Sequence, residues 1–186
     1  MREDTVRVAE TTHVGVAVAD YEPVRWRCSW TIEKRLGDDL TVDPFEVVHG
    51  DGNLLMYGGA SCLWEALIGN GTATSAQTLT YFNSSNAYIG VGDSNTAEAA
   101  TQTDLQASSN KTRKAATPTH TDGTSSGSAS VTFAATFSTS DSNYVWAEWA
   151  IFNSASGGRM LNRKVASLGT KTSAASWSLS VTLTLS

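Results

Sequence analysis

Apolar and polar residues alternate along several stretches of this chain, a pattern typical of β-strands that bury one face. Val24–Glu33 places Trp26, Cys28 and Trp30 on one face, and Trp177–Leu185 alternates just as regularly. Further strands are expected at Phe45–His49, Leu79–Asn83, Ala87–Val91, Ser130–Phe137, Asn143–Phe152 and Met160–Val165. Many short strands at this spacing predict a mainly β protein, an antiparallel β-sandwich of jelly-roll-like form.

One segment has a helical period instead. Its apolar residues recur at intervals of three and four: Ala60, Leu63, Trp64, Leu67 and Ile68. This predicts one short α-helix near residues 60–69 whose apolar face packs against the sheet. Ser61 caps the helix or lies in its first turn, and Gly69 ends it.

Glycine, serine and acidic residues mark the connections between these elements. Loops or turns are expected at Leu36–Asp43, His49–Asn53, Gly92–Thr103 and Thr117–Ser128, whereas Asp104–Ala116 shows no clear pattern. Residues 1–23 are expected to form an extended arm. The predicted organisation is an acidic arm and β-hairpin over residues 1–53, followed by a β-sandwich domain over residues 54–186.

The charge is unevenly distributed. Residues 1–53 hold 6 Lys/Arg and 11 Asp/Glu, whereas residues 54–186 hold 7 of each. Ser and Thr together make up 47 of the 186 residues, which suits a pleated surface better than a helical one. The chain has no basic stripe, so we expect no direct contact with nucleic acid. No stretch of 18 apolar residues and no apolar leader segment is present, so neither a membrane span nor a signal peptide is expected.

The residues that could carry chemistry form no catalytic or metal-binding motif. His13, His49 and His120 lie in unrelated segments without zinc-ligand spacing. Cys28 and Cys62 each lie near a Trp in an apolar run, which favours two reduced core thiols over a disulfide. We therefore predict no catalytic residue, no metal and no cofactor.

Three acidic loops could be read as calcium sites, beginning at Asp38, Asp93 and Asp141. None has the twelve-residue pattern of an EF-hand. Local hydrogen bonding within each loop explains the same residues, and we expect Asp93 to bond amides of its own loop.

Glu148 lies between Trp146 and Trp149 in an apolar strand, where a carboxylate needs a partner. Arg163 or Lys164 of the following strand could supply it. A salt bridge is favoured over a catalytic acid, because a glycosidase needs a second placed carboxylate.

The tryptophans could line a sugar-binding groove, but core packing is the more economical interpretation. We expect five of them in the core: Trp26, Trp30, Trp146, Trp149 and Trp177.

Residues 53–186 also contain a familiar series of motifs. They are Tyr88–Ser94 (YIGVGDS) with Gln102–Leu105 (QTDL), Lys111–Lys114 (KTRK), Trp146–Asn153 (WAEWAIFN) and Arg159–Val165 (RMLNRKV). This series resembles a module of tailed-bacteriophage virion proteins that also occurs in tail-fibre and tail-collar proteins. Ala150 departs from it, since the module usually has Gly there.

The resemblance implies a non-enzymatic structural protein located in the virion, assembled in the cytoplasm of the host bacterium. The first hypothesis is a capsid decoration or minor capsid protein that cements major capsid subunits. Its expected partners are the major capsid protein or other virion proteins, with several copies associating on the particle. The alternatives are a tail or baseplate component, including a receptor-binding adhesin, and a carbohydrate-active hydrolase. An adhesin predicts an exposed aromatic groove, a decoration protein a flat footprint, and a hydrolase two close inward carboxylates.

Overall fold

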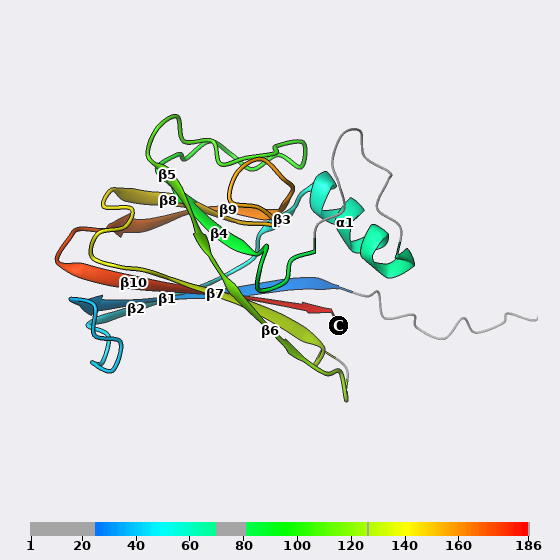
Figure 1. Ribbon diagram of the computed structural model, residues 1–186, viewed down its shortest axis with the longest axis horizontal. Coiled ribbons are helices and arrows are strands. Elements are labelled where there is room, and N and C mark those ends of the chain that lie inside the picture. The colour runs from blue at the N-terminus through cyan, green and yellow to red at the C-terminus, as the bar shows by residue number, and fades with distance from the viewer. Residues whose placement is uncertain (1–24, 70–80, 126, 186) are drawn as a thin grey trace, which may run out of the picture.

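Two five-stranded antiparallel sheets face each other, with one helix at one end (Figure 1). The computed structural model describes residues 25–69, 81–125 and 127–185. The first sheet has the order β2 (Glu46–Asp51), β1 (Trp26–Leu36), β10 (Ala175–Leu185), β7 (Ser130–Phe137) and β6 (Thr117–Thr121). The second has the order β3 (Leu54–Leu55), β9 (Met160–Thr170), β8 (Val145–Phe152), β4 (Tyr88–Gly92) and β5 (Lys111–Ala115), and the helix is α1 (Tyr57–Ile68). The predicted β-sandwich with one short helix is confirmed.

Strands from the two ends of the described chain form the centre of the first sheet. β1 pairs with β10 along its whole length, from Trp26 opposite Leu185 to Leu36 opposite Ala175. The alternation predicted for both strands is confirmed, because Ile32 and Leu179 are buried without exposure. The outward side chains between them are mostly polar, so each strand buries one face.

The chain passes from the second sheet to the first at Ala116. This residue is buried and joins β5 to β6, and its amide donates to the carbonyl of Ala87 at 2.8 Å. The prediction of a loop over Thr117–Ser128 is therefore wrong for its first five residues, which pair with β7. β6 lies at the edge of its sheet, where Pro118 is tolerated because one side of the strand needs no ladder bonds.

The predicted strand at Leu79–Asn83 is also wrong where the structure describes it. Residues 81–83 lead into a turn instead, because the carbonyl of Asn83 accepts from the amides of Asn86 and Ala87. Residues 79 and 80 and the predicted arm over residues 1–23 lie outside the described residues. Conversely, the unpatterned segment Asp104–Ala116 contains β5.

Tryptophans dominate the core between the sheets. The ring of Trp146 makes edge contacts with Phe137 at 4.7 Å and with Trp177 at 4.9 Å between centroids. Trp30 contacts Trp149 in the same way. These four tryptophans are buried, as predicted, whereas Trp26 is half-buried and packs against the edge of the core. Cys28 and Cys62 are both buried and unbridged, as predicted.

Candidate functional site

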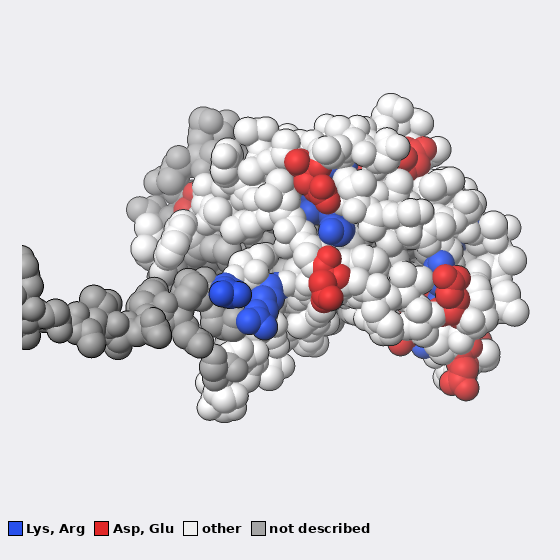
Figure 2. Space-filling view, turned by 180° about the vertical axis from the view of Figure 1, so that it is seen from behind, with Lys and Arg blue, Asp and Glu red and all other residues white. Residues whose placement is uncertain are grey.

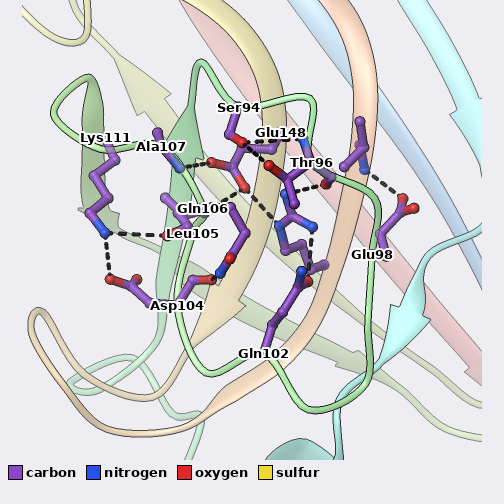
Figure 3. Close-up of polar contacts among 12 residues, drawn as sticks. Ser94, Thr96, Glu98, Gln102, Asp104, Leu105, Gln106, Ala107, Lys111 and Glu148 are labelled. Carbon is purple, nitrogen blue, oxygen red and sulfur yellow. Dashed lines mark hydrogen bonds and ion pairs between the residues drawn. The ribbon is translucent and has the colours of Figure 1, made fainter.

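A buried ion pair joins β8 to β9. Arg163 Nε donates to Glu148 Oε2 at 2.7 Å, and neither side chain is exposed to solvent. Glu148 also accepts from two backbone amides, that of Gln106 at 3.0 Å and that of Ala107 at 2.8 Å (Figure 3). The partner predicted for Glu148 is thus present and is Arg163. Both carboxylate oxygens have donors, so burial of this charge is compensated.

The same pair fixes the loop between β4 and β5, residues 93–110. Arg163 donates to the side-chain oxygen of Gln102 and to the carbonyl of Thr96, each at 2.9 Å. Glu98 accepts from the amide of Val165 on β9 at 2.6 Å. Figure 3 shows this loop wrapped around Glu148, with the side chain of Gln102 and the backbone of Gln106 and Ala107 directed at the ion pair.

Asp104 anchors the far part of this loop to β5. Its carboxylate accepts from Lys111 and from Arg113, both at 2.8 Å. Partial burial would raise the pKa of Asp104, but the hydrogen bonds from Lys111 and Arg113 outweigh it and hold the pKa below its ordinary value. The Arg113 guanidinium also lies 3.5 Å above the ring of Phe152.

Glycine is required beside this cluster. A side-chain carbon on Gly92 would lie 2.6 Å from Glu148 Oε1, and one on Gly90 would lie 2.7 Å from the ring of Phe152. In the sequence these glycines and Glu148 belong to separate motifs, and nothing there indicates that they lie in contact. We call the Glu148–Arg163 ion pair and the loop residues bonded to it the loop clamp. Residues of the motifs at Tyr88–Ser94, Gln102–Leu105, Trp146–Asn153 and Arg159–Val165 all lie in or beside this clamp.

The carboxylate of Glu148 is not accessible from solvent. Glu148 accepts three hydrogen bonds and is sealed from solvent, so it has no water to activate. The other buried carboxylate among the described residues is that of Glu65 in α1, which accepts from Arg159 at 2.7 Å. Each of these two buried carboxylates is thus bonded to an arginine.

The structure does not bring the described histidines together. His49 hydrogen-bonds Thr31 at 3.0 Å, His120 lies 3.5 Å from Asp122, and His13 lies outside the described residues. Within the part of the chain that the structure describes, no group of three His, Cys, Asp or Glu residues could hold a metal ion.

Local hydrogen bonding within the loop is present at Asp141, whose carboxylate accepts from Ser138, whereas Asp38 bonds a residue 101 positions away along the chain. Asp38 accepts from Thr139, Asp141 from Ser138 and Lys114, and Asp93 from the side-chain amide of Asn110. The bond expected between Asp93 and amides of its own loop thus comes from a side chain at the other end of that loop.

α1 is turned the opposite way from the prediction. Its buried residues are Gly59, Cys62 and Glu65, whereas its large apolar residues face solvent. We call these four residues the α1 face: Leu63 (42% exposed), Trp64 (67%), Leu67 (73%) and Ile68 (69%). A side-chain carbon on Gly59 would lie 2.2 Å from the carbonyl oxygen of Leu161, so only glycine lets the helix approach β9 this closely.

A buried ion pair completes the anchor of α1. Arg159 donates to Glu65 at 2.7 Å and to the sulfur of Cys62 at 3.2 Å. Burial raises the pKa of the Cys62 thiol despite this arginine, so the sulfur stays protonated at neutral pH. In the sequence, Gly59 followed six residues later by the only charged residue of the helix, Glu65, could have indicated that this side of α1 is buried.

None of the helices in the described part of the chain has the length and apolar character of a membrane span.

An apolar groove of about 340 Å³ opens between the sheets beside α1. Nine of its twelve lining residues are apolar: Trp26, Leu63, Phe82, Ala129, Val131, Phe133, Leu161, Leu183 and Leu185. His120, Ser130 and Thr184 complete it. Trp26 was expected in the core, and the sequence pattern does not predict an opening beside it.

Comparison with known proteins found no matching protein family, no matching curated protein and no matching solved structure. The structure contains an exposed apolar helix face, an apolar groove and two buried ion pairs whose partners neutralise one another. An exposed contiguous apolar surface of this kind marks an interaction site. The α1 face is therefore the candidate functional site.

Proposed function

We propose that this chain is a non-enzymatic structural protein of a bacteriophage virion, acting as a capsid decoration or minor capsid protein that binds major capsid subunits. The single observation that carries the binding role is the α1 face. Four large apolar side chains of one helix stand in solvent, and the only charged residue of that helix, Glu65, is buried. The phage assignment itself is supported by the motif resemblance.

The outer face of the first sheet supports a broad, flat footprint. Its central strands present hydroxyl side chains that bond one another across strands. Thr132 lies 2.7 Å from Thr182, and Thr136 lies 2.9 Å from Ser178, oxygen to oxygen. The neighbouring strand β1 presents Arg27, Glu33 and Arg35 on the same face, and Glu33 is bonded to Arg35 at 2.6 Å. The paired hydroxyls of β7 and β10 add no further charge that a partner would have to match, so this part of the face suits a seam between large subunits.

The groove favours protein over sugar as the ligand of this end of the molecule. A sugar site needs several placed hydrogen-bonding groups among its aromatic residues. This groove has three polar lining residues, His120, Ser130 and Thr184, against nine apolar ones. An apolar side chain of a protein partner fits that lining better, which argues against a glycan-binding adhesin.

Gold-labelled antibodies on intact virions, with blots of separated heads and tails, test the proposed location. Label scattered over the head, with a band in the head fraction, is the expected result. Label confined to the tail with a tail band would overturn the decoration role in favour of a tail or baseplate component. Absence from both blots would overturn the virion assignment, because a blot also detects buried epitopes.

A further inference from the structure

The hairpin between β1 and β2 presents a second exposed apolar surface, at the opposite end of the sandwich from the groove (Figure 1). We call residues 36–47 the hairpin tip. Leu40, Val42 and Phe45 stand in solvent there, with Phe45 57% exposed. One end of the molecule is thus concave and apolar, and the other end is convex and apolar.

Hydrogen bonds hold the hairpin tip in shape. Asp39 accepts from both the amide and the hydroxyl of Thr41, at 2.9 and 2.7 Å. Asp38 accepts from the amide and hydroxyl of Thr139, and Arg35 donates to the carbonyl of Val42 at 2.9 Å. A tip ordered in advance loses little conformational entropy on binding.

The two ends also differ in charge. The hairpin tip contains four carboxylates and no Lys or Arg: Asp38, Asp39, Asp43 and Glu46. Of these, Glu46 is bonded to the neighbouring Lys34 at 3.0 Å. Figure 2 shows acidic side chains at the tip end of the molecule and basic side chains gathered at the other end.

The basic end is the end that holds the groove. Arg25 and Arg27 are exposed on either side of Trp26, which lines the groove. The further ionisable groups nearby are Asp51, Lys164 and the pair His120–Asp122. Among the residues that the structure describes at this end, the arginines therefore balance the carboxylates, unlike at the hairpin tip.

We propose that copies of this chain associate head to tail, with the hairpin tip of one copy seated in the groove of the next. Shape and charge agree on this pairing, because a convex acidic tip meets a concave basic end. Pairing like ends would bring four carboxylates against four. A head-to-tail contact builds rings or filaments, since each copy keeps one free tip and one free groove.

This inference goes beyond the proposed function and does not rest on it, because it concerns contacts between copies of the purified chain. Sedimentation velocity over a hundredfold concentration range tests it. The wild-type chain is expected to form a concentration-dependent series of oligomers. A chain that stays monomeric over the whole range would overturn the proposal, whatever its place in a virion.

Two complementary variants make the test specific. Leu40→Ser with Phe45→Ser removes the tip, and Leu185→Glu, at a half-exposed residue of the groove, blocks the groove. Each variant alone is expected to associate at least about tenfold more weakly than wild type. Their mixture is expected to form a dimer and nothing larger, because it contains one intact tip and one intact groove. A mixture that stays monomeric, or variants that still associate alone, would overturn the head-to-tail contact.

Charge reversal provides a second pair of variants away from the core. Arg25→Glu with Arg27→Glu is expected to weaken association about tenfold at low salt and less at high salt. Mixing it with a second chain that carries Asp39→Lys and Asp43→Lys is expected to restore association as oligomers in which the two chains alternate, because every tip then faces a groove end of opposite charge. Ser108→Glu, in the exposed part of the β4–β5 loop, is the matched control and should associate like wild type. No effect of either reversal, or an equal effect of the control, would contradict the charge pairing.

Discussion

The carboxylate of Glu65 in α1 accepts a hydrogen bond from Arg159, at the start of β9, at 2.7 Å, and both side chains are almost completely buried. This pair sets the rotation of the helix. With Glu65 directed inward, the apolar residues on the opposite side of α1 must face solvent. The exposure of the α1 face therefore depends on this ion pair together with the close approach of Gly59 to Leu161.

Replacing Glu65 by Ala should destabilise the protein by about 3–5 kcal/mol, because it removes the carboxylate that accepts from the buried Arg159 at 2.7 Å. Urea unfolding followed by tryptophan fluorescence measures this loss. The control is Glu33→Ala, which removes a partly exposed ion pair with Arg35 and should cost at most about 1 kcal/mol. Equal losses for the two variants would show that the Glu65 pair does not hold the helix.

Replacing Arg163 by Met should release the β4–β5 loop. The loop would lose the bonds from Arg163 to Gln102 and Thr96, and the buried carboxylate of Glu148 would lose its counter-ion, at a cost of about 3–5 kcal/mol. Hydrogen exchange at the amides of Gln106 and Ala107 should accelerate more than exchange in β10. Unchanged protection of those two amides would mean that the loop is held by other contacts.

Trp177→Ala should lower the free energy of unfolding by about 3–5 kcal/mol, since the ring is buried against Trp146 and lies beneath the ammonium group of Lys34. Trp64→Ala is the matched control. Its ring is two-thirds exposed, so the change should stay within about 0.5 kcal/mol. Thermal unfolding compares the two, and a wild-type-like midpoint for Trp177→Ala would refute the inward assignment.

Acid should destabilise the fold through Asp141. A hydrogen bond from Lys114, with further bonds from Ser138, lowers the pKa of Asp141 from 3.8 to about 2. A lowered pKa in the folded state stabilises the protein above pH 3.8, and that stabilisation is lost as the pH falls towards 2. Urea unfolding between pH 5 and pH 2 should show this decline, and Asp141→Asn should flatten it. An identical decline in the variant would assign it to other carboxylates.

Period-two alternation was enough to predict the sandwich, because strands such as β1 and β10 bury one face and expose the other. The spacing of three and four residues predicted a helix correctly but misplaced its faces, since it put Leu67 and Ile68 inside. The close approach at Gly59 and the buried partner of Glu65 decide that orientation, and both depend on β9, a hundred residues further along the chain. The loop clamp was predictable only in part. The sequence indicates that Glu148 needs a cationic partner, but it does not indicate that the amides of Gln106 and Ala107 also donate to it.

The most direct test of the binding role uses virions produced without the gene for this chain. Purified chain is added back, the particles are sedimented, and the bound copies are counted. The proposed function predicts saturable binding by wild type and by Ser108→Glu, and loss of binding by Leu67→Glu with Ile68→Glu, which changes only exposed residues of the α1 face. Absence of wild-type binding, or equal binding by the α1 variant, would contradict the account.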